Sequence, residues 1–278
     1  MVQVIGGVVG QRTWMALVAA LVAVPALPAA QSTDDRAAAR DVVTRRGDAV
    51  ITVLGTLKAR MSQAGRDRPA PDQAVQASAT VLDGTGLTVV ALSTVDPGSI
   101  LARNPAFAAA KMNLETELTE VKMRLADGAE VPAKIVLRDS DLDLLFLRPA
   151  AAPDKPLPSV DTSSPPFNVV DAIVLVRRTQ EIAGWKPAAS LAAIEVAVEK
   201  PRRFYLLATS ATAGGLGSSV FDLKGQFGGI VGLRASQDAR HNALNGMIGG
   251  MLQTLGMVPV VIPAADIREV AKQAAASK

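Results

Sequence analysis

The sequence predicts a mostly β fold, and three observations support that prediction. Short runs rich in valine, isoleucine and other strand-forming residues recur along the chain. Two turns between such runs contain Asp-Gly, at 83–84 and 127–128, and this dipeptide favours tight hairpins. Helical patterns are few and short. We therefore expect a protein built mainly from antiparallel strands.

The first half is expected to begin with a short helix over 34–45, where alanines are mixed with charges of both signs. Strands are expected to follow at 49–54, 77–82, 87–92, 121–125 and 135–137. Residues 58–73 hold charges, a glycine and two prolines, which indicates a loop. A second short helix is expected from Asn104-Pro105 to Lys111, because proline is favoured in a first helical turn.

Residues 151–166 are rich in proline, serine and aspartate, which is typical of a linker between two halves of a chain. Strands are then expected at 172–176, 192–198, 204–207, 219–221 and 229–233. A closing helix follows, because Ile267, Val270 and Ala271 form one apolar stripe. The second half is therefore also expected to be mostly β.

Residues 1–30 have the features of a secretory signal peptide. A single charge, Arg12, precedes the apolar run 14–24, and prolines and small residues follow. A basic start, a short apolar core and a small-residue exit are typical of such peptides. We therefore expect an exported protein, periplasmic or secreted, with no membrane span after the signal is removed. The alternative is an uncleaved segment that anchors the chain in a membrane.

Composition excludes several classes of function. The net charge of +3 over 278 residues gives no field that would attract nucleic acid, and an aromatic share of 3% argues against base stacking. The chain has no cysteine and one histidine, His241, so the usual zinc ligands are missing. We expect no metal and no other cofactor.

Two segments, 125–148 and 214–231, resemble the trypsin-like domain of HtrA/Deg-type serine proteases. The Asp-Leu-Asp-Leu-Leu-Phe-Leu run at 141–147 resembles the family's segment that supplies the triad aspartate, at Asp143. The stretch 86–95 resembles the strand that ends in the triad histidine, and Ser93 stands at that position. The Phe-Asp-Leu-Lys-Gly run at 221–225 resembles the segment after the nucleophile, whose position falls on Leu216.

The resemblance extends from about Val42 to the C-terminus and implies two six-stranded antiparallel β-barrels. The first would lie within residues 31–150, the second within 167–278, and the linker 151–166 between them. A short N-terminal helix and a C-terminal helix would complete the fold. No PDZ-like domain, the usual peptide-sensing module of HtrA proteins, is expected after the barrels.

The three triad positions imply a degenerate catalytic site. A serine protease needs a hydroxyl, a base that takes its proton, and a carboxylate that orients the base. Leu216 has no hydroxyl, Ser93 does not accept a proton near neutral pH, and Asp143 alone orients nothing. Asp143 is then expected to be a solvated or hydrogen-bonded carboxylate at the start of a strand.

Glycines and serines survive in the segment that would hold the nucleophile. These residues are Gly214, Gly215, Gly217, Ser218 and Ser219. In an active relative this loop offers N–H groups to a developing oxyanion. Here Gly214, Gly215, Gly217 and Ser218 are a candidate oxyanion or peptide-binding loop, or else only a tight turn.

The sequence therefore predicts an inactive protease homologue that binds a protein or peptide partner through the cleft between its barrels. The alternative is an active serine endopeptidase with Ser218 or Ser219 as an unconventional nucleophile. His241 or Lys224 would then be the candidate base, although both are more typical of exposed turns. A third possibility is a purely structural subunit.

Overall fold

The computed structural model describes residues 32–63, 66–69, 71–98, 112–207, 215–235 and 257–276. The architecture below belongs to the unit that begins at Thr33. Several predictions fall outside the described residues: the signal peptide at 1–30, the helix at 104–111, Gly214 and His241. No helix within the described ranges is long and apolar enough to cross a membrane.

The described residues of this unit form thirteen strands and a few short helices. The helices are α1 (Thr33–Arg46), η1 (Gly47–Ala49), α2 (Leu92–Val95), η2 (Glu181–Ala183) and α7 (Ala264–Ala276). The strands of the first half are β1 (Val50–Gln63), β2 (Arg66–Pro69), β3 (Gln73–Val81), β4 (Thr88–Ala91), β5 (Met112–Arg124), β6 (Glu130–Asp139) and β7 (Leu144–Pro149). Those of the second half are β8 (Ala172–Arg178), β9 (Pro187–Val198), β10 (Phe204–Leu207), β11 (Ser219–Asp222), β12 (Phe227–Ala235) and β13 (Met257–Pro263).

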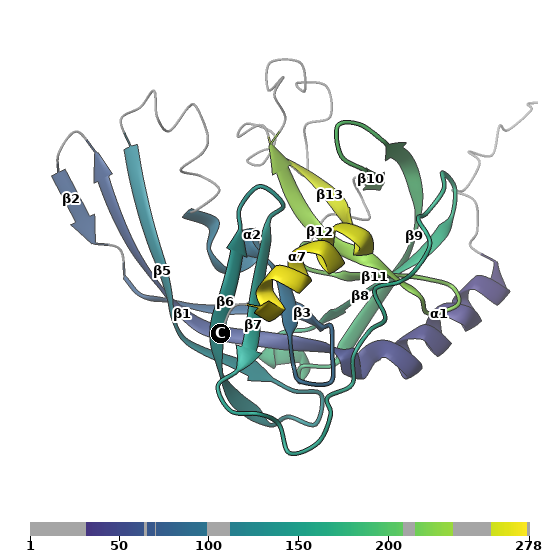
Figure 1. The fold of residues 1–278 in the computed structure, drawn as a ribbon, viewed down its shortest axis with the longest axis horizontal. Coiled ribbons are helices and arrows are strands. Elements are labelled where there is room, and N and C mark those ends of the chain that lie inside the picture. Colours follow the sequence, from purple (N-terminus) through teal and green to yellow (C-terminus); the bar gives the residue numbers. More distant parts are fainter. Residues whose placement is uncertain are drawn as a thin grey trace, which may run out of the picture. The chain divides into compact units, whose positions relative to one another are not determined.

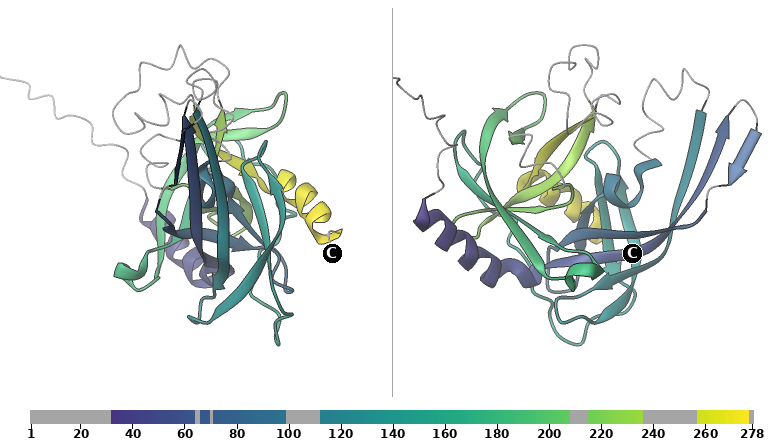
Figure 2. Two further views of the ribbon diagram at one scale, coloured as in Figure 1. Left: turned by 90° about the vertical axis from the view of Figure 1, so that its left-hand side faces the viewer. Right: turned by 180° about the vertical axis from the view of Figure 1, so that it is seen from behind.

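Each half closes into a six-stranded antiparallel barrel (Figures 1 and 2). The first has the order β1-β3-β4-β7-β6-β5, and β5 pairs back with β1. The second has the order β8-β9-β10-β13-β12-β11, and β11 pairs back with β8. Counted along the chain, both barrels have the strand order 1-2-3-6-5-4. This shared connectivity is consistent with a trypsin-like double barrel and confirms the predicted fold class.

Alternate side chains of the central strands fill two different spaces, which explains why these strands are apolar without interruption. In β7, Leu145 and Leu147 pack inside the first barrel, whereas Phe146 packs between the barrels. In β8, Ile173 and Leu175 point into the second barrel, whereas Val174 joins the cluster between them. Side chains alternate across a strand, so both faces are buried.

Helix α7 covers the boundary between the two barrels. Ile267, Val270 and Ala274 of this helix are buried in the cluster that both barrels share. The helix contacts β12 and β13 of the second barrel as well as β6 and β7 of the first, and Figure 1 shows it crossing the strands in yellow. Its apolar stripe therefore helps to hold the barrels together.

Polar contacts also join the barrels. The Thr80 and Ser219 hydroxyls lie 2.7 Å apart with both residues fully buried. The Arg178 N–H donates to Ser78 Oγ at 2.7 Å, and the Arg178 guanidinium donates to Val50 O at 2.5 Å and Gly47 O at 2.8 Å. Because these partners come from both barrels, the interface fixes one arrangement of the two.

The predicted loop at 58–73 is wrong. Strand β1 continues to Gln63, and β2 occupies 66–69 at its edge (Figure 1). The extension pairs with β5, where Lys58 faces Glu117 and Arg60 faces Glu115. Opposite charges across a strand pair stabilise it, so charges that suggested a loop form a polar strand face instead. Pro69 is tolerated because β2 is an edge strand.

Candidate functional site

Asp143 lies at the centre of the candidate site, directly before β7. The turn that delivers it is held by Asp139, whose Oδ1 accepts the N–H groups of Asp141 and Leu142 at 3.0 Å each. Asp143 has a left-handed backbone with φ of +57°, and it is only 1% exposed. A non-glycine residue in this conformation is uncommon, so the surrounding contacts hold it there.

The Asp143 carboxylate accepts three hydrogen bonds, and they come from both barrels. The Ser93 N–H donates to Oδ1 at 2.6 Å, and the Ser93 hydroxyl donates to Oδ2 at 2.7 Å. The Leu233 N–H of β12 donates to Oδ2 at 2.6 Å. The Asp143 carbonyl accepts a further hydrogen bond from the Leu92 N–H at 2.9 Å. Ser93 and Asp143, which the resemblance assigned to neighbouring triad positions, are therefore in direct contact.

Burial dominates the electrostatics of this carboxyl. It raises the pKa of Asp143 from 3.8 to about 6, although the bonds from Leu233 and Ser93 act in the opposite direction. Desolvation disfavours the charged form of an acid, and hydrogen bonds to that form favour it. The three donors are neutral groups, so they offset the loss of water only in part.

The loop at the nucleophile position lies against the same site. A Cβ atom on Gly217 would lie 3.6 Å from Thr94 Cγ2, beside Ser93, and 3.2 Å from Ser78 O. Gly217 has φ of +77°, which suits glycine. Leu216 is half-buried and packs against the core of the second barrel. Gly217, the residue after the nucleophile position, therefore lies close to the segment that holds Ser93, while Leu216 itself packs into the second barrel.

Two backbone N–H groups of this loop are occupied by internal hydrogen bonds. The Gly217 N–H donates to Val231 O at 2.8 Å, and the Ser218 N–H donates to Gly215 O at 3.0 Å. Donors for an oxyanion have to point at the position of the substrate oxygen. The two N–H groups already have acceptors, an arrangement that favours a tight turn over an oxyanion hole.

The two candidate nucleophiles are inaccessible. Ser218 and Ser219 are both fully buried. The Ser219 hydroxyl pairs with Thr80, and among the described residues the Ser218 hydroxyl has no hydrogen-bond partner, so no base in the described part of the chain holds either of them. Lys224 lies in the turn from β11 to β12, where its carbonyl accepts from the Arg45 guanidinium of α1 at 3.2 Å.

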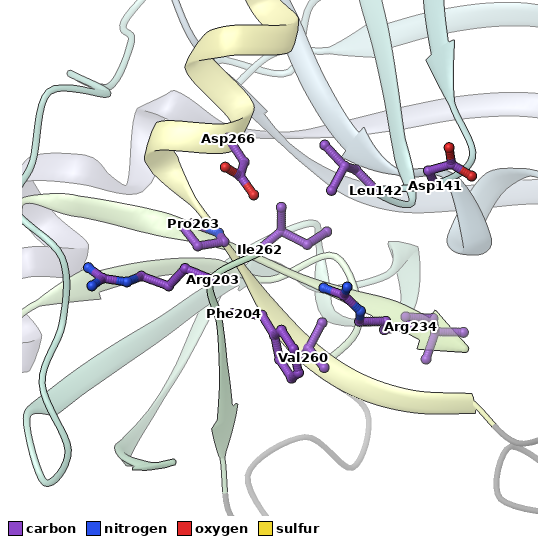
Figure 3. Close-up of a pocket in the computed structure, with 10 residues that line it drawn as sticks. Asp141, Leu142, Arg203, Phe204, Arg234, Val260, Ile262, Pro263 and Asp266 are labelled. Carbon is purple, nitrogen blue, oxygen red and sulfur yellow. The ribbon is translucent and has the colours of Figure 1, made fainter. Parts of the chain in front are cut away.

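A small pocket lies beside Asp143 and is lined by both barrels (Figure 3). We call it the Asp266 pocket; its lining residues are Asp141, Leu142, Arg203, Phe204, Leu233, Arg234, Val260, Ile262, Pro263 and Asp266. Its volume of about 10 Å³ admits about one water-sized molecule. Apolar side chains form its floor, and charged groups surround them.

The charged groups of the Asp266 pocket are partly compensated. The Arg234 guanidinium lies 4.5 Å from the centre of the Phe204 ring, a cation–π contact. Burial raises the pKa of Asp266, while Arg202 and Arg234 lower it. Within the part of the chain that the structure describes, Asp266 Oδ2 is buried without a hydrogen-bond partner. The pocket therefore presents both signs of charge around an apolar floor.

The sequence did not identify Leu233 or Arg178 as important. Leu233 acts through its backbone N–H, and side-chain identity carries no signal for that. The sequence holds one signal for Arg178, because it is a charged residue that follows shortly after the apolar run 172–176.

Within the described ranges, no group of three or more His, Cys, Asp or Glu side chains could hold a metal ion.

Comparison with models of known protein families finds no match for this chain, and neither does a search of curated proteins. The class of the protein therefore rests on its architecture. Two closed six-stranded barrels with the same connectivity are consistent with a trypsin-like fold. Function has to be argued from the site, because one fold hosts many activities.

Proposed function

We propose that the chain is an exported, HtrA-like relative of trypsin-like proteases that has lost proteolysis and acts by binding a protein or peptide partner. The observation that carries the proposal is the direct bond between the Ser93 hydroxyl and the Asp143 carboxylate. In an active triad a histidine lies between the carboxylate and the nucleophile. Here the Ser93 hydroxyl donates directly to the Asp143 carboxylate, and no base lies between the two groups.

The chemistry of the pair supports this proposal. The Ser93 hydroxyl donates its proton to Oδ2, and the Leu233 N–H donates to the same oxygen. The carboxylate is therefore occupied by donors from the protein itself. Leu216, at the nucleophile position, cannot form an acyl intermediate. Proteolysis by the standard route would need both missing groups at once.

The partner-binding part of the proposal rests on the Asp266 pocket. It opens at the boundary between the barrels, next to Asp143, and combines an apolar floor with charged groups from two barrels and α7. Apolar surface with a few polar groups is the usual composition of a recognition site. The pocket holds about one water-sized molecule, so a partner would not insert a side chain into it but would pack over its opening, against the charged groups, without using any catalytic residue.

Site-specific photo-cross-linking tests this function. A photoreactive residue replaces Arg234 in the pocket, and in a matched control it replaces Glu195, an exposed residue of β9. We expect a discrete cross-linked protein or peptide product from position 234 and none from position 195. Equal capture at the two positions, or none at position 234 while the protein is folded, would contradict binding through this cleft.

A further inference from the structure

A separate pocket lies at one end of the first barrel, beside the linker that leads to the second. Its walls come from η1, the start of β1, the end of β3, the turn from β5 to β6, and the linker. We call it the Leu157 pocket; its lining residues are Asp48, Ile51, Val81, Leu125, Ala126, Asp127, Leu157 and Pro158. It shares no lining residue with the Asp266 pocket.

The apolar wall of the Leu157 pocket continues the core of the first barrel. Ile51 and Val81 are each 1% exposed and belong to the apolar cluster of that barrel. Leu125 and Leu157 are partly buried and pack against the same cluster. Six of the eight lining residues are therefore apolar, so an apolar group that enters the pocket leaves water for a hydrocarbon surface.

The linker wall of the pocket is held in place by the first barrel. The Leu157 N–H donates to Gly84 O at 3.0 Å, and the Val160 N–H donates to Val81 O at 3.0 Å. A Cβ atom on Gly86 would lie 3.2 Å from Leu157 Cδ1, so the absence of a side chain on Gly86 permits this close approach. Because both backbone bonds flank Pro158, the pocket is formed before anything binds.

The size of the Leu157 pocket limits what it can hold. Its volume is about 160 Å³. A cavity of roughly 150 Å³ that is lined by apolar side chains is large enough for one benzene molecule. The pocket therefore fits a single small ring, and it is too small for an extended peptide or a nucleotide.

The charges around the pocket disfavour an anion. Both charged lining residues are carboxylates, Asp48 and Asp127. Asp48 lies 4.0 Å from Arg178, while the described ion pairs do not include Asp127, and Arg124 pairs with Glu130 at 3.3 Å. Among the described residues, no cation lines the pocket. Nothing in its wall would therefore offset the cost of moving a negative charge out of water.

We propose that the Leu157 pocket binds a small apolar compound of about the size of benzene that carries no negative charge. The ring of this compound would contact Ile51, Val81 and Leu157, and a polar substituent would remain in solvent. The proposal is independent of the proposed function, because the lining residues include none of the triad positions and no residue of the Asp266 pocket.

Titration of the isotope-labelled full chain, followed by its amide NMR spectrum, tests the proposal. The probe is benzyl alcohol, and benzoate is its control because it has the same ring with a negative charge. We expect benzyl alcohol to shift the amides of Ile51, Val81 and Leu157 in a saturable way, with a dissociation constant of about 1 mM or lower. Benzoate should bind at least about tenfold more weakly.

A pocket-filling variant gives a second test. Leu157→Trp places a large ring in the pocket and should abolish the saturable shifts. Leu223→Trp is the matched control, since Leu223 is a half-buried leucine in the turn from β11 to β12, and it should leave affinity within about twofold. The comparison of the two probes on the wild type needs no variant, so it decides the question even where Leu157→Trp does not fold.

Four results would each overturn the proposal. They are the absence of saturable binding of benzyl alcohol by the wild type, amide shifts confined to other parts of the chain, equal affinity for benzoate, and unchanged binding by a folded Leu157→Trp.

Discussion

The buried Asp143 carboxyl should make the protein more stable as pH falls from 7 to 5, opposite to the behaviour of a salt-bridged aspartate. Burial raises its folded-state pKa to about 6, above the ordinary value of 3.8. The folded protein therefore binds this proton more tightly than the unfolded chain does. The resulting stabilisation is fully present below pH 3.8 and is lost as pH rises through 6.

The size of the effect follows from the two pKa values. The whole shift corresponds to about 3 kcal/mol in the free energy of unfolding, at about 1.4 kcal/mol per pKa unit. Between pH 7 and pH 5 the folded carboxyl changes from mostly ionised to mostly protonated, while the unfolded one stays ionised. This residue should therefore add about 1.3 kcal/mol of stability over that interval.

Urea denaturation of the wild type and Asp143→Asn, at pH 5 and pH 7, measures this contribution. The asparagine does not titrate, and the other carboxyls, including Asp266, contribute equally to both proteins. The stability of the wild type relative to Asp143→Asn should rise by about 1.3 kcal/mol on going to pH 5. A relative stability that stays constant, or that falls at pH 5, would refute the assignment of a raised pKa to this buried group.

Three further predictions concern the barrel interface and the triad positions. Ser219→Ala should lower the free energy of unfolding, measured by urea denaturation, by about 1–2 kcal/mol, because it leaves the buried Thr80 hydroxyl without its partner. In a Thr80→Val background, where that hydroxyl is absent, the same substitution should lower the free energy of unfolding by less. Gly217→Ala should destabilise by about 1–2 kcal/mol, since alanine disfavours φ of +77°, and an unchanged melting temperature would contradict the turn. Leu216→Ser alone should not cleave peptide substrates, because Ser93 supplies no base; measurable turnover would show that the triad positions are misassigned.

The sequence predicts the barrels well where turn chemistry and apolar alternation agree. Asp83-Gly84 and Asp127-Gly128 mark hairpins that the structure contains between β3 and β4 and between β5 and β6. It fails for the end of β1, because charged residues there stabilise a strand only through partners on β5. Cross-strand pairs between distant segments leave no local pattern, so residues 58–63 resemble a loop when taken alone.

The sequence likewise predicts one part of the candidate site and misses another. The contact between Ser93 and Asp143 follows from the resemblance to HtrA/Deg-type proteases, which assigned both positions. The N–H of Leu233 that completes the carboxylate's hydrogen bonds belongs to the backbone, so no residue type predicts it. The buried state of Ser218 and Ser219 is likewise a tertiary property, set by how the two barrels meet. Sequence patterns identify Ser93, Asp143 and the two serines, and packing decides what these residues can do.

Labelling with a fluorophosphonate probe, followed by peptide mass spectrometry, tests the central claim most directly. Such probes react covalently with serines that are activated by a base. The account predicts no labelled serine in the folded protein. Specific labelling at Ser218 or Ser219, abolished by the matching alanine variant, would contradict it and establish an active serine hydrolase.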